Sequence, residues 1–405
     1  MKVPFAPPHV DDMIVNAVID TIKSGWITTG PKTKLFEQKI TEYCNCKRSI
    51  CLNSATSALE MVLRWFGIEK GDEVIIPVYT YCATANVVIH CGATPVFVDI
   101  NENDFNISID NIKNAITDRT KVIMPVDIAG FPCDYDDIYE TINASGIIKM
   151  FNPNNNNQKK LGRILVLSDA AHSLGARYKG RKSGTMADFT VFSFHAVKNL
   201  TTAEGGAISI NLPEQFDVDK IYNFFNINSL HGQNKDALAK TKKNSWKYDV
   251  ISAGYKANMT DILASIGLVE LKRYDMSILT KRKYIFDRYT EAFSKKEWAI
   301  IPPYENSFKT SSYHLYLIRV KNFDESKRDE MIQYIFDEGV SVNVHFQPLP
   351  LLTYYKSIGY NMKNYPIAYK NYSTVISLPV FYDITDDQID TVIKVVNDSY
   401  FKLIK

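Results

Sequence analysis

Apolar residues recur along this chain with two different periods, and the alternation between them predicts the fold class. Ile14, Val18 and Ile22 fall four positions apart in 11–24, which predicts an amphipathic helix that stops at Gly25. Short apolar runs rich in β-branched residues predict buried strands at 49–52, 73–77, 94–99, 121–126 and 163–167. Helical patterns are expected between these strands, at 34–43, 58–66, 109–116 and in a helix that runs through His90. Strands that alternate with helices at this spacing predict an α/β fold with a mostly parallel central sheet and flanking helices.

The pattern changes beyond about residue 275, where helices alternate with short strands. The expected elements there are helices at 281–293 and 327–338 and strands at 314–320 and 340–344. A chain of 405 residues is long for one hydrophobic core, so two domains are expected. We expect a large α/β domain over 1–255 and a smaller α+β domain over 256–405, which closes over the cleft.

Two polar segments interrupt the pattern in the large domain. Residues 151–160, part of an Asn-rich insertion near 150–160, are expected to form a surface loop without a catalytic role. Residues 211–248 have few apolar positions and a charged run at 240–243, so we expect an exposed excursion there. A helix at 262–274 is expected to follow, with Thr260 or Asp261 as its N-cap.

Composition and charge exclude several classes of function. The chain has 47 Lys and Arg against 45 Asp and Glu. This balance gives no strong positive potential that would attract nucleic acid or an anionic membrane. No apolar run reaches the roughly 18 residues of a transmembrane helix, and the N-terminus lacks the apolar core of a signal peptide. Six cysteines include one C-x-C pair, Cys44 and Cys46, without a second pair at zinc spacing. We expect reduced thiols, a cytoplasmic location and no metal site.

A lysine lies between two predicted core strands. The strands are ADFTVFSF at 187–194 and AISI at 207–210, and Lys198 lies in the connection between them, before Gly205 and Gly206. Burial lowers the pKa of a lysine, and an unprotonated amine can form a Schiff base with an aldehyde. A lone lysine at a turn more often keeps its ammonium group in water, so its companions decide the interpretation.

The companion of Lys198 is Asp169, which directly follows the buried run 163–167. Ligands of open α/β sheets bind outside the carboxyl ends of the strands, and a carboxylate there can hold the protonated ring nitrogen of pyridoxal phosphate. Asp169 could equally cap the helix that follows it. The turn 53–57 leads from a strand into a helix, where backbone N–H groups and the helix dipole favour a phosphate, although Ser and Thr are also ordinary N-caps.

Six segments of the chain resemble, in the same order, the DegT-type (DegT/DnrJ/StrS) nucleotide-sugar aminotransferases, which depend on pyridoxal 5′-phosphate (PLP). The segments are GWITTGPK at 25–32, NSATS at 53–57, SDAAH at 168–172, SFHAVKN at 193–199, AEGG at 203–206 and GYKAN at 254–258. The resemblance runs from the first helix almost to the C-terminus. It implies the PLP-dependent transferase fold type I and an aminotransferase activity, and it is much less specific for the substrate.

The resemblance also implies which residues hold PLP and carry out the reaction. Lys198 would bond the cofactor and then move protons, while Asp169 would keep its ring nitrogen protonated. The other implied cofactor contacts are Thr56, Ser57 and Ser193 at the phosphate, Tyr81 against the ring, His172 beside cofactor and substrate, and Asn258 at the phosphate of a neighbouring subunit. Tyr79 competes with Tyr81 for the stacking position. Related sugar dehydratases have a histidine in place of the lysine, so Lys198 favours transamination.

Substrate and assembly follow from the same resemblance. The implied substrate contacts are Trp26 and Thr29 in the first loop, Lys256 near the nucleotide, and His345 in a substrate-facing turn. Because Asn258 would reach the partner's phosphate, the enzyme is expected to be a homodimer with shared active sites. We expect glutamate as amino donor and C4 of a UDP-2-acetamido-2,6-dideoxy-4-keto-hexose as acceptor, for polysaccharide or glycoconjugate biosynthesis. A UDP-4-keto-pentose, a dTDP-3- or 4-keto-hexose, or a non-catalytic PLP-binding regulator remain alternatives.

Overall fold

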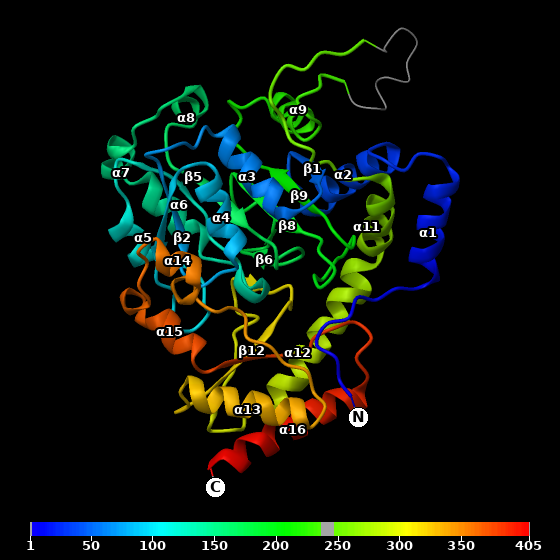
Figure 1. Ribbon diagram of the computed structural model, residues 1–405, viewed down its shortest axis with the longest axis vertical. Coiled ribbons are helices and arrows are strands. Elements are labelled where there is room, and N and C mark those ends of the chain that lie inside the picture. Colours follow the sequence, from blue (N-terminus) through cyan, green and yellow to red (C-terminus); the bar gives the residue numbers. More distant parts are fainter. Residues whose placement is uncertain (1, 236–246, 405) are drawn as a thin grey trace.

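Over the residues that the structure describes, 2–235 and 247–404, the computed structural model contains a central sheet of seven strands (Figure 1). Their order across the sheet is β1-β9-β8-β5-β4-β2-β3. The strands are β1 (Arg48–Leu52), β2 (Glu73–Pro77), β3 (Thr94–Val98), β4 (Thr120–Ile123), β5 (Leu165–Asp169), β8 (Phe189–Ser193) and β9 (Gly206–Ile210). Strand β9 runs antiparallel to β1 and β8, and the other neighbours pair in parallel. The predicted α/β fold with a mostly parallel sheet is therefore confirmed.

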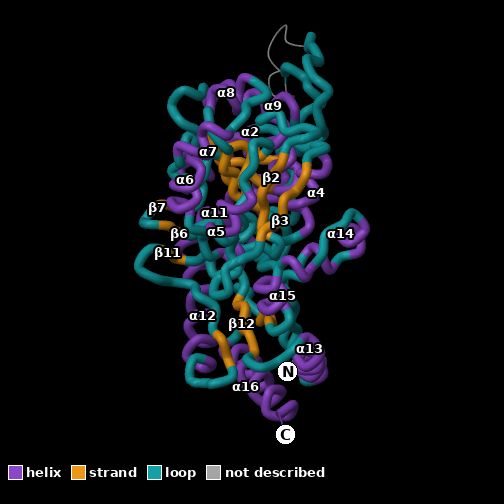
Figure 2. The backbone as a smooth tube through the Cα atoms, turned by 90° about the vertical axis from the view of Figure 1, so that its left-hand side faces the viewer, coloured by secondary structure: helices purple, strands orange, loops and turns teal. Residues whose placement is uncertain are grey.

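Helices cover both faces of this sheet, as the orange strands between purple helices show in Figure 2. Strands β2, β4, β5 and β9 are buried along their whole length, which is why they appear in the sequence as continuous rather than alternating apolar runs. The helices of this part are α1 (Asp12–Lys23), α2 (Pro31–Cys44), α3 (Ala55–Trp65), α4 (Cys82–His90), α5 (Ile109–Ala115), α6 (Tyr135–Asn143), α7 (Ser145–Met150), α8 (Asn156–Leu161), α9 (Val218–Asn228) and α11 (Asp261–Arg273). In the described part of the chain, no helix combines the length and the apolar character needed to cross a membrane.

The register of the sheet brings functional segments to one edge. Ser193 at the end of β8 pairs with Gly206 at the start of β9, and Gly206 also pairs with Leu52 at the end of β1. Asp169 is the last residue of the neighbouring strand β5. The ends of β1, β5 and β8 and the start of β9 therefore lie side by side.

A second, smaller sheet forms the C-terminal part and has the order β10-β12-β13. Its strands are β10 (Ala299–Ile300), β12 (Tyr316–Val320) and β13 (Val375–Leu378), and the helices of this part are α12 (Thr280–Phe293), α13 (Glu325–Asp337), α14 (Thr353–Ser357), α15 (Pro366–Tyr372) and α16 (Asp386–Ile404). Helix α11, a π-helical turn (Tyr274–Leu279) and α12 connect the two parts (Figure 1). Two-residue strands β6 (Arg177–Tyr178), β7 (Arg181–Lys182) and β11 (Lys309–Thr310) form a third sheet.

The N-terminal residues belong to the C-terminal core. Val3 is buried in the cluster that includes Ile285 and Val396, and it forms a parallel bridge with Val340. The prediction of a strand at 340–344 is wrong. Its residues form isolated bridges with different segments, Val340 with Val3 and Asn343 with Ser377. No continuous ladder forms there.

The expected surface loop at 151–160 is present only at 151–155, and the expectation is wrong for 156–160. Residues Asn156–Leu161 form α8, and Gln158 is fully buried. Side-chain amides of this segment donate to the last carbonyls of α3: Asn155 and Gln158 to the Phe66 oxygen at 2.9 and 3.0 Å, and Asn157 to the Trp65 oxygen at 2.8 Å. These carbonyls have no partner within their own helix. The asparagines therefore cap α3.

The exposed excursion expected at 211–248 contains a packed helix. Helix α9 buries Ile221, Tyr222 and Phe225 in the core of the large sheet. The polar residues between them lie on its outer face, which hid the helical pattern in a polar segment. The charged run 240–243 lies outside the described residues.

Replacement of Gln158 by alanine should destabilise the protein, because it removes the bond to Phe66 and leaves the Asn154 N–H, which donates to Gln158 Oε1, without a partner. We expect a loss of about 1–2 kcal/mol in the free energy of unfolding, measured by chemical denaturation. The exposed neighbour Asn156 offers a matched control, and Asn156→Ala should change stability by less than about 0.5 kcal/mol. Equal effects of the two variants would refute the capping role.

Candidate active site

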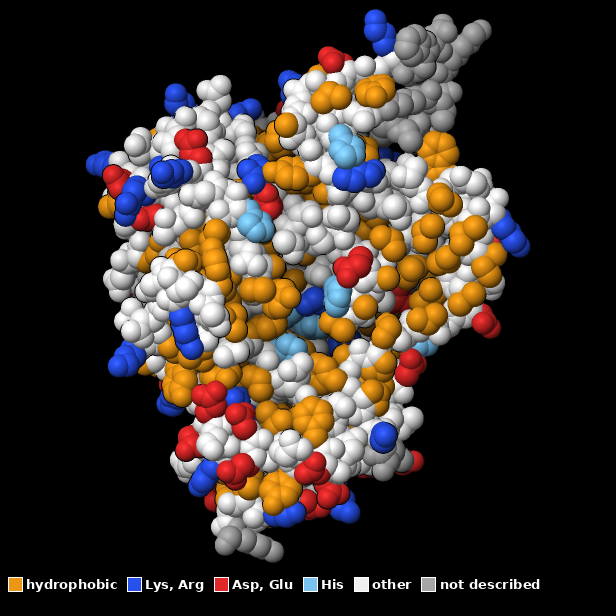
Figure 3. All heavy atoms as spheres, viewed as in Figure 1, with side chains coloured by type: hydrophobic (Ala, Val, Ile, Leu, Met, Phe, Trp, Pro, Cys, Tyr) orange, Lys and Arg blue, Asp and Glu red, His pale blue; other side chains and the backbone are white. Residues whose placement is uncertain are grey.

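A cavity of about 480 Å³ opens where the strand ends meet. Its walls come from the start of α3, the start of α4, the end of β5, the β8–β9 connection, the segment before β12 and the turn at 345–346. Residues 5–6 of the N-terminal segment complete it. Figure 3 shows this hollow in the middle of one face, with histidine side chains gathered around it. Few side chains in the walls are charged, so the cavity suits a ligand with apolar surface.

Lys198 lies in the tight connection between β8 and β9. The Phe194 N–H donates to the Gly205 carbonyl, the Thr202 N–H donates to the Phe194 carbonyl, and the Lys198 N–H donates to the His195 carbonyl. These bonds close the connection and direct the half-buried lysine into the cavity. Burial lowers the pKa of Lys198 from 10.5 to about 8, although the Asp169 carboxylate opposes the shift. A nucleophilic amine therefore becomes available near neutral pH.

Asp169 presents a buried carboxylate to the same cavity. Thr84 Oγ1 donates to Oδ2 at 2.8 Å, and the Ala171 N–H donates to Oδ1 at 3.2 Å. Burial raises the pKa of Asp169, while these bonds and Lys198 act to lower it. Among the described residues no cationic side chain lies within ion-pair distance of this carboxylate. A buried carboxylate without a cationic partner favours a ligand that brings a positive charge.

His172 follows three residues later and forms a cavity wall. Its ring lies 4.3 Å from the ring of His314 and 5.7 Å from that of Phe346, measured between centroids. Burial lowers its pKa well below 6.5, with Lys198 and His345 adding to the shift, so the ring is neutral. Its Nδ1 is buried without a hydrogen-bond partner. The single proton of the neutral ring is therefore favoured on Nε2, because an orphaned acceptor is cheaper than an orphaned donor.

The start of α3 forms an anion site. Ser54 is the N-cap, and its Oγ accepts from the Ser57 N–H at 3.1 Å. Ser54, Thr56 and Ser193 line the cavity, whereas the Ser57 hydroxyl lies beside Ser54 and accepts its hydrogen bond at 3.0 Å. A Cβ at Gly206 would meet the Ser54 backbone at 2.5 Å, so only glycine lets β9 approach this helix start. Helix dipole, N–H groups and hydroxyls together favour a phosphate here.

The two tyrosines that could stack on a cofactor ring differ in their exposure to the cavity. Tyr79 is fully buried, and its hydroxyl donates to the His345 carbonyl at 2.5 Å. Tyr81 caps α4, lines the cavity and exposes 60% of its surface, with its ring 5.9 Å from that of Phe346. A ring that lies open to the cavity can stack on a ligand, so Tyr81 and not Tyr79 is available for that role.

His345 lies on the C-terminal side of the cavity. Its Nδ1 is 3.0 Å from Ser377 Oγ, and its ring stacks on Phe5 with centroids 5.4 Å apart. Burial, with a smaller contribution from Lys198, lowers its pKa to about 4, so it is neutral at physiological pH. The sequence-predicted residue is therefore part of the cavity wall.

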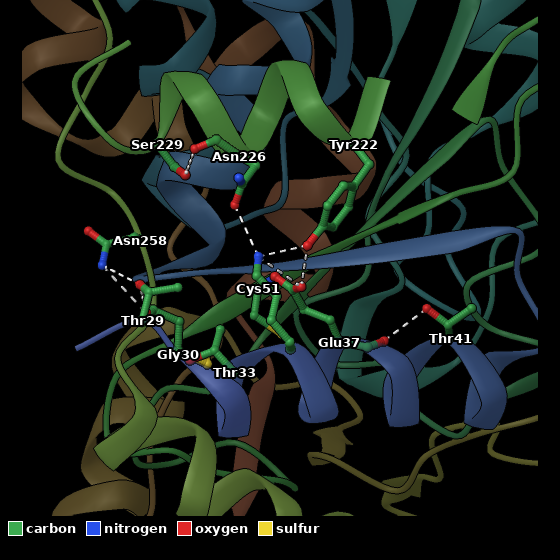
Figure 4. A network of polar contacts seen from close by, with 12 residues as sticks. Thr29, Gly30, Thr33, Glu37, Thr41, Cys51, Tyr222, Asn226, Ser229 and Asn258 are labelled. Carbon is green, nitrogen blue, oxygen red and sulfur yellow. Dashed lines mark hydrogen bonds and ion pairs between the residues drawn. The ribbon is translucent and has the colours of Figure 1, made fainter. Parts of the chain in front are cut away.

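Five sequence-predicted residues do not line the cavity of their own chain: Ser57, described above, and four residues of two surface loops. Asn258 Nδ2 donates to Thr29 Oγ1 at 2.6 Å, and the Thr29 hydroxyl donates to the Met259 carbonyl at 2.5 Å (Figure 4). Trp26 Nε1 donates to the Thr29 carbonyl at 3.2 Å, and Lys256 is exposed. The two loops thus hold each other at the surface, outside the cavity.

The structure adds cavity residues that the sequence did not indicate. Phe5 and Phe346 form apolar walls, Thr84 orients Asp169, and His314 lies against His172. They come from four distant segments. Phe346 follows His345 in the predicted substrate-facing turn, whereas no periodic pattern or short motif predicts a cavity position for Phe5, Thr84 or His314. The hydrophobic pattern predicts Thr84 only as part of a helix and His314 only as part of a strand.

The arrangement fits PLP, which combines an aldehyde, a ring nitrogen that can carry a proton, and a phosphate. Lys198 offers an amine of lowered pKa for the aldehyde, and Asp169 offers a carboxylate without a cationic partner for the ring nitrogen. The start of α3 and Ser193 offer donors for the phosphate.

Comparison with known proteins agrees with this site. The model of the DegT/DnrJ/EryC1/StrS aminotransferase family matches residues 8–151 and 157–397. Protein MJ1066 of Methanocaldococcus jannaschii is 40% identical over 399 residues, with 97% of each chain covered. The spore coat polysaccharide biosynthesis protein SpsC of Bacillus subtilis is 37% identical over 402 residues, with 98% of this chain and 96% of SpsC covered.

A solved structure is similar over the whole chain. The putative sugar aminotransferase Spr1654 of Streptococcus pneumoniae superposes in its PMP form with a TM-score of 0.95 and 45% identity, covering 99% of this chain and 100% of its own. Its PLP form superposes with the same TM-score and 43% identity over 100% of both chains.

The pH at which Lys198 reacts should reveal its lowered pKa. Only the unprotonated amine attacks an acylating reagent, so its labelling rate should rise with pH to a midpoint near 8 in cofactor-free protein. Mass spectrometry of the peptide that contains Lys198 measures this rate. Asp169→Asn should lower the midpoint further, because the Asp169 charge raises the lysine pKa. A midpoint at 10.5, the ordinary value, would contradict the desolvated site.

Proposed function

The chain belongs to the DegT/DnrJ/EryC1/StrS aminotransferase family and is a PLP-dependent sugar aminotransferase. From this premise we propose that it transfers an amino group from glutamate to C4 of a UDP-2-acetamido-2,6-dideoxy-4-keto-hexose. The product would be a 4-amino sugar for polysaccharide or glycoconjugate biosynthesis. The name of SpsC, a polysaccharide biosynthesis protein, supports this pathway class.

The observation that carries the proposal is the apolar part of the cavity wall. Phe5, Leu315, Phe346 and Val380 make that wall apolar, and within the described residues no arginine lines the cavity. A sugar with a carboxylate at C6 would bring a buried charge without a guanidinium partner. The methyl group of a 6-deoxy sugar instead gains from contact with these side chains. The SFHAVKN and AEGG segments, which resemble those of members that act on UDP-linked 4-keto sugars, support the same choice.

Each residue of the site has a defined task in the proposed reaction. PLP, when bound, supplies an aldehyde for the amino group and a ring that withdraws electrons from the reacting carbon. With a pKa of about 8, roughly a tenth of Lys198 is unprotonated at pH 7, far more than for an ordinary lysine. Lys198 Nζ removes a proton from one carbon and returns it to another as general base and acid. Asp169 stabilises the positive charge on the ring nitrogen throughout, held in place by Thr84.

We further infer a homodimer in which each chain completes the other's cavity. Two groups of apolar side chains are exposed. Those that line the cavity include Tyr81 and Val197, and those on and beside α1 are Val10, Met13, Val15, Ile19, Ile22 and Ile27. Figure 3 shows hydrophobic side chains gathered over α1 and around the hollow. Exposed patches of this kind usually mark a protein interface. Asn258, Trp26, Thr29 and Lys256, which lie outside their own cavity, would then contact the partner's ligands.

We also propose that the enzyme works in the cytoplasm. All six cysteines are free in the structure, and four of them are buried. Free thiols persist in a reducing compartment such as the cytoplasm.

The absorbance spectrum of purified protein tests the reaction. A visible band should shift into the near ultraviolet when glutamate is added, and Lys198→Ala should lack both the band and the shift. The UDP-2-acetamido-2,6-dideoxy-4-keto-hexose should restore the band faster than a UDP-4-keto-pentose or a dTDP-4-keto-hexose. Restoration by one of the other sugars alone would refute the substrate, and no response to any sugar would favour a regulator.

Mixing two inactive variants tests the shared site. Lys198→Ala lacks the amine, and Asn258→Asp should repel the partner's phosphate by its added charge. A mixed dimer contains one site with both native residues, so refolding the two variants together should recover up to about a quarter of wild-type activity. Equal mixtures that stay inactive although dimers exchange would exclude a contribution of Asn258 to the partner's site.

A further inference from the structure

His314 is a buried side chain in the cavity that the reaction described above does not use. It lies just before β12, exposes 5% of its surface and lines the cavity beside Lys198, Leu315 and His345. Arg282 donates to its carbonyl at 3.2 Å, which fixes the backbone. Ser312 Oγ donates to the His172 carbonyl and so ties this segment to the end of β5. The position of His314 is therefore rigid.

The hydrogen bonds of Asn199 determine which nitrogen of His314 carries the proton. Asn199 Nδ2 donates to the Ser312 carbonyl, which can only accept, and this fixes the orientation of the amide. Asn199 Oδ1 then faces His314 Nδ1 at 2.8 Å and must accept from it. Burial lowers the pKa of His314 well below 6.5, and His172 and Lys198 add to the shift, so the ring carries one proton. Nδ1 holds that proton, and Nε2 carries a lone pair.

That lone pair faces the cavity. Within the described residues His314 Nε2 has no hydrogen-bond partner, and it is not among the unpartnered atoms sealed from solvent, which are His172 Nδ1, Thr190 Oγ1, Trp298 Nε1 and Asn397 Oδ1. Its accessible surface therefore opens on the cavity that the side chain lines. The two neighbouring histidines differ in their hydrogen-bonding character, because His172 favours a donor at Nε2 and His314 presents an acceptor there.

An acceptor held this rigidly requires a donor on the ligand. In the proposed sugar, C1 carries the nucleotide, C2 an acetamido group, C4 the ketone and C5 the methyl-bearing carbon, so the C3 hydroxyl is the one free hydroxyl of the ring. C3 is adjacent to the carbon that reacts at Lys198, and His314 is bonded to Asn199, the next residue in the chain. The acetamido N–H is one carbon further from the reacting centre.

We propose that His314 is a substrate-binding residue whose Nε2 accepts a hydrogen bond from the C3 hydroxyl of the keto-sugar. This inference rests on the proposed substrate. Loss of the contact leaves a buried acceptor or hydroxyl unpaired, which weakens binding of the sugar about tenfold. His314 thus makes the enzyme select sugars with a free hydroxyl next to the reacting carbon.

Two substitutions separate the functions of the two ring nitrogens. In His314→Asn the side-chain amide can still donate to Asn199, but no acceptor reaches the cavity. In His314→Gln the side-chain oxygen lies where Nε2 was, and the bond to Asn199 is lost. The measurement is calorimetric binding of the UDP-linked 4-amino sugar product and of UDP alone to the full-length enzyme. The PLP form is first converted by glutamate to the pyridoxamine phosphate form, with which the amino sugar cannot exchange its amino group.

We expect His314→Asn to bind the product about tenfold more weakly than the wild type and UDP with unchanged affinity. His314→Gln should retain most of the affinity for the product. A 3-deoxy analogue of the product should bind the wild type about tenfold more weakly and lose nothing more in His314→Asn, because the same contact is removed twice.

Three outcomes would overturn the inference. They are unchanged product affinity in His314→Asn, a parallel loss of UDP affinity, or a full further loss with the 3-deoxy analogue. If His314→Asn does not retain the visible cofactor band, the comparison of product and 3-deoxy analogue on the wild type decides alone. If the wild type fails to bind the UDP-linked product at all, the proposed substrate is wrong, and that result is distinct from failure of the His314 contact.

Discussion

The removal of the Lys198 amine from water is the constraint on which the site depends. Burial lowers its pKa to about 8, and Asp169, the nearby carboxylate that acts on it, limits that shift. A sheet edge can hold both groups because β5 and β8 end side by side, and β9 begins at the same level. Keeping an amine and a carboxylate partly dehydrated costs free energy. The large buried core beneath them offsets this cost.

The same dehydration explains why three of the histidines that line the cavity are neutral. His172, His314 and His345 all have lowered pKa values, with burial as the main cause and Lys198 as a repeated contributor. Neutral rings offer one donor and one acceptor each, and the surrounding hydrogen bonds decide their arrangement. A ligand that enters the cavity therefore meets directional polar contacts from these three neutral rings.

Much of the large sheet could be predicted from the sequence, because parallel strands buried on both faces leave continuous apolar runs such as 163–167. Lys198 and Asp169 could also be identified, since Asp169 ends one buried strand and Lys198 lies in the connection after another, at the edge where ligands bind. Features that depend on distant partners could not. The asparagines near 155 cap a helix that ends about 90 residues earlier, and His314 acquires its tautomer from an amide 115 residues away. Hydrophobic periodicity carries no information on either contact.

The participation of Val3 in the C-terminal core has a consequence for how the protein forms during synthesis. Val3 must wait for Val340 before it can pair, and Phe5, two residues on, must wait for His345 before it can form the cavity wall. Contacts of such sequence separation form late, because the entropy of closing a very long loop opposes them. The large sheet can fold while the ribosome still holds the rest of the chain, whereas the cavity closes only after translation is nearly complete. The nascent enzyme therefore acquires its core first and its complete ligand site last.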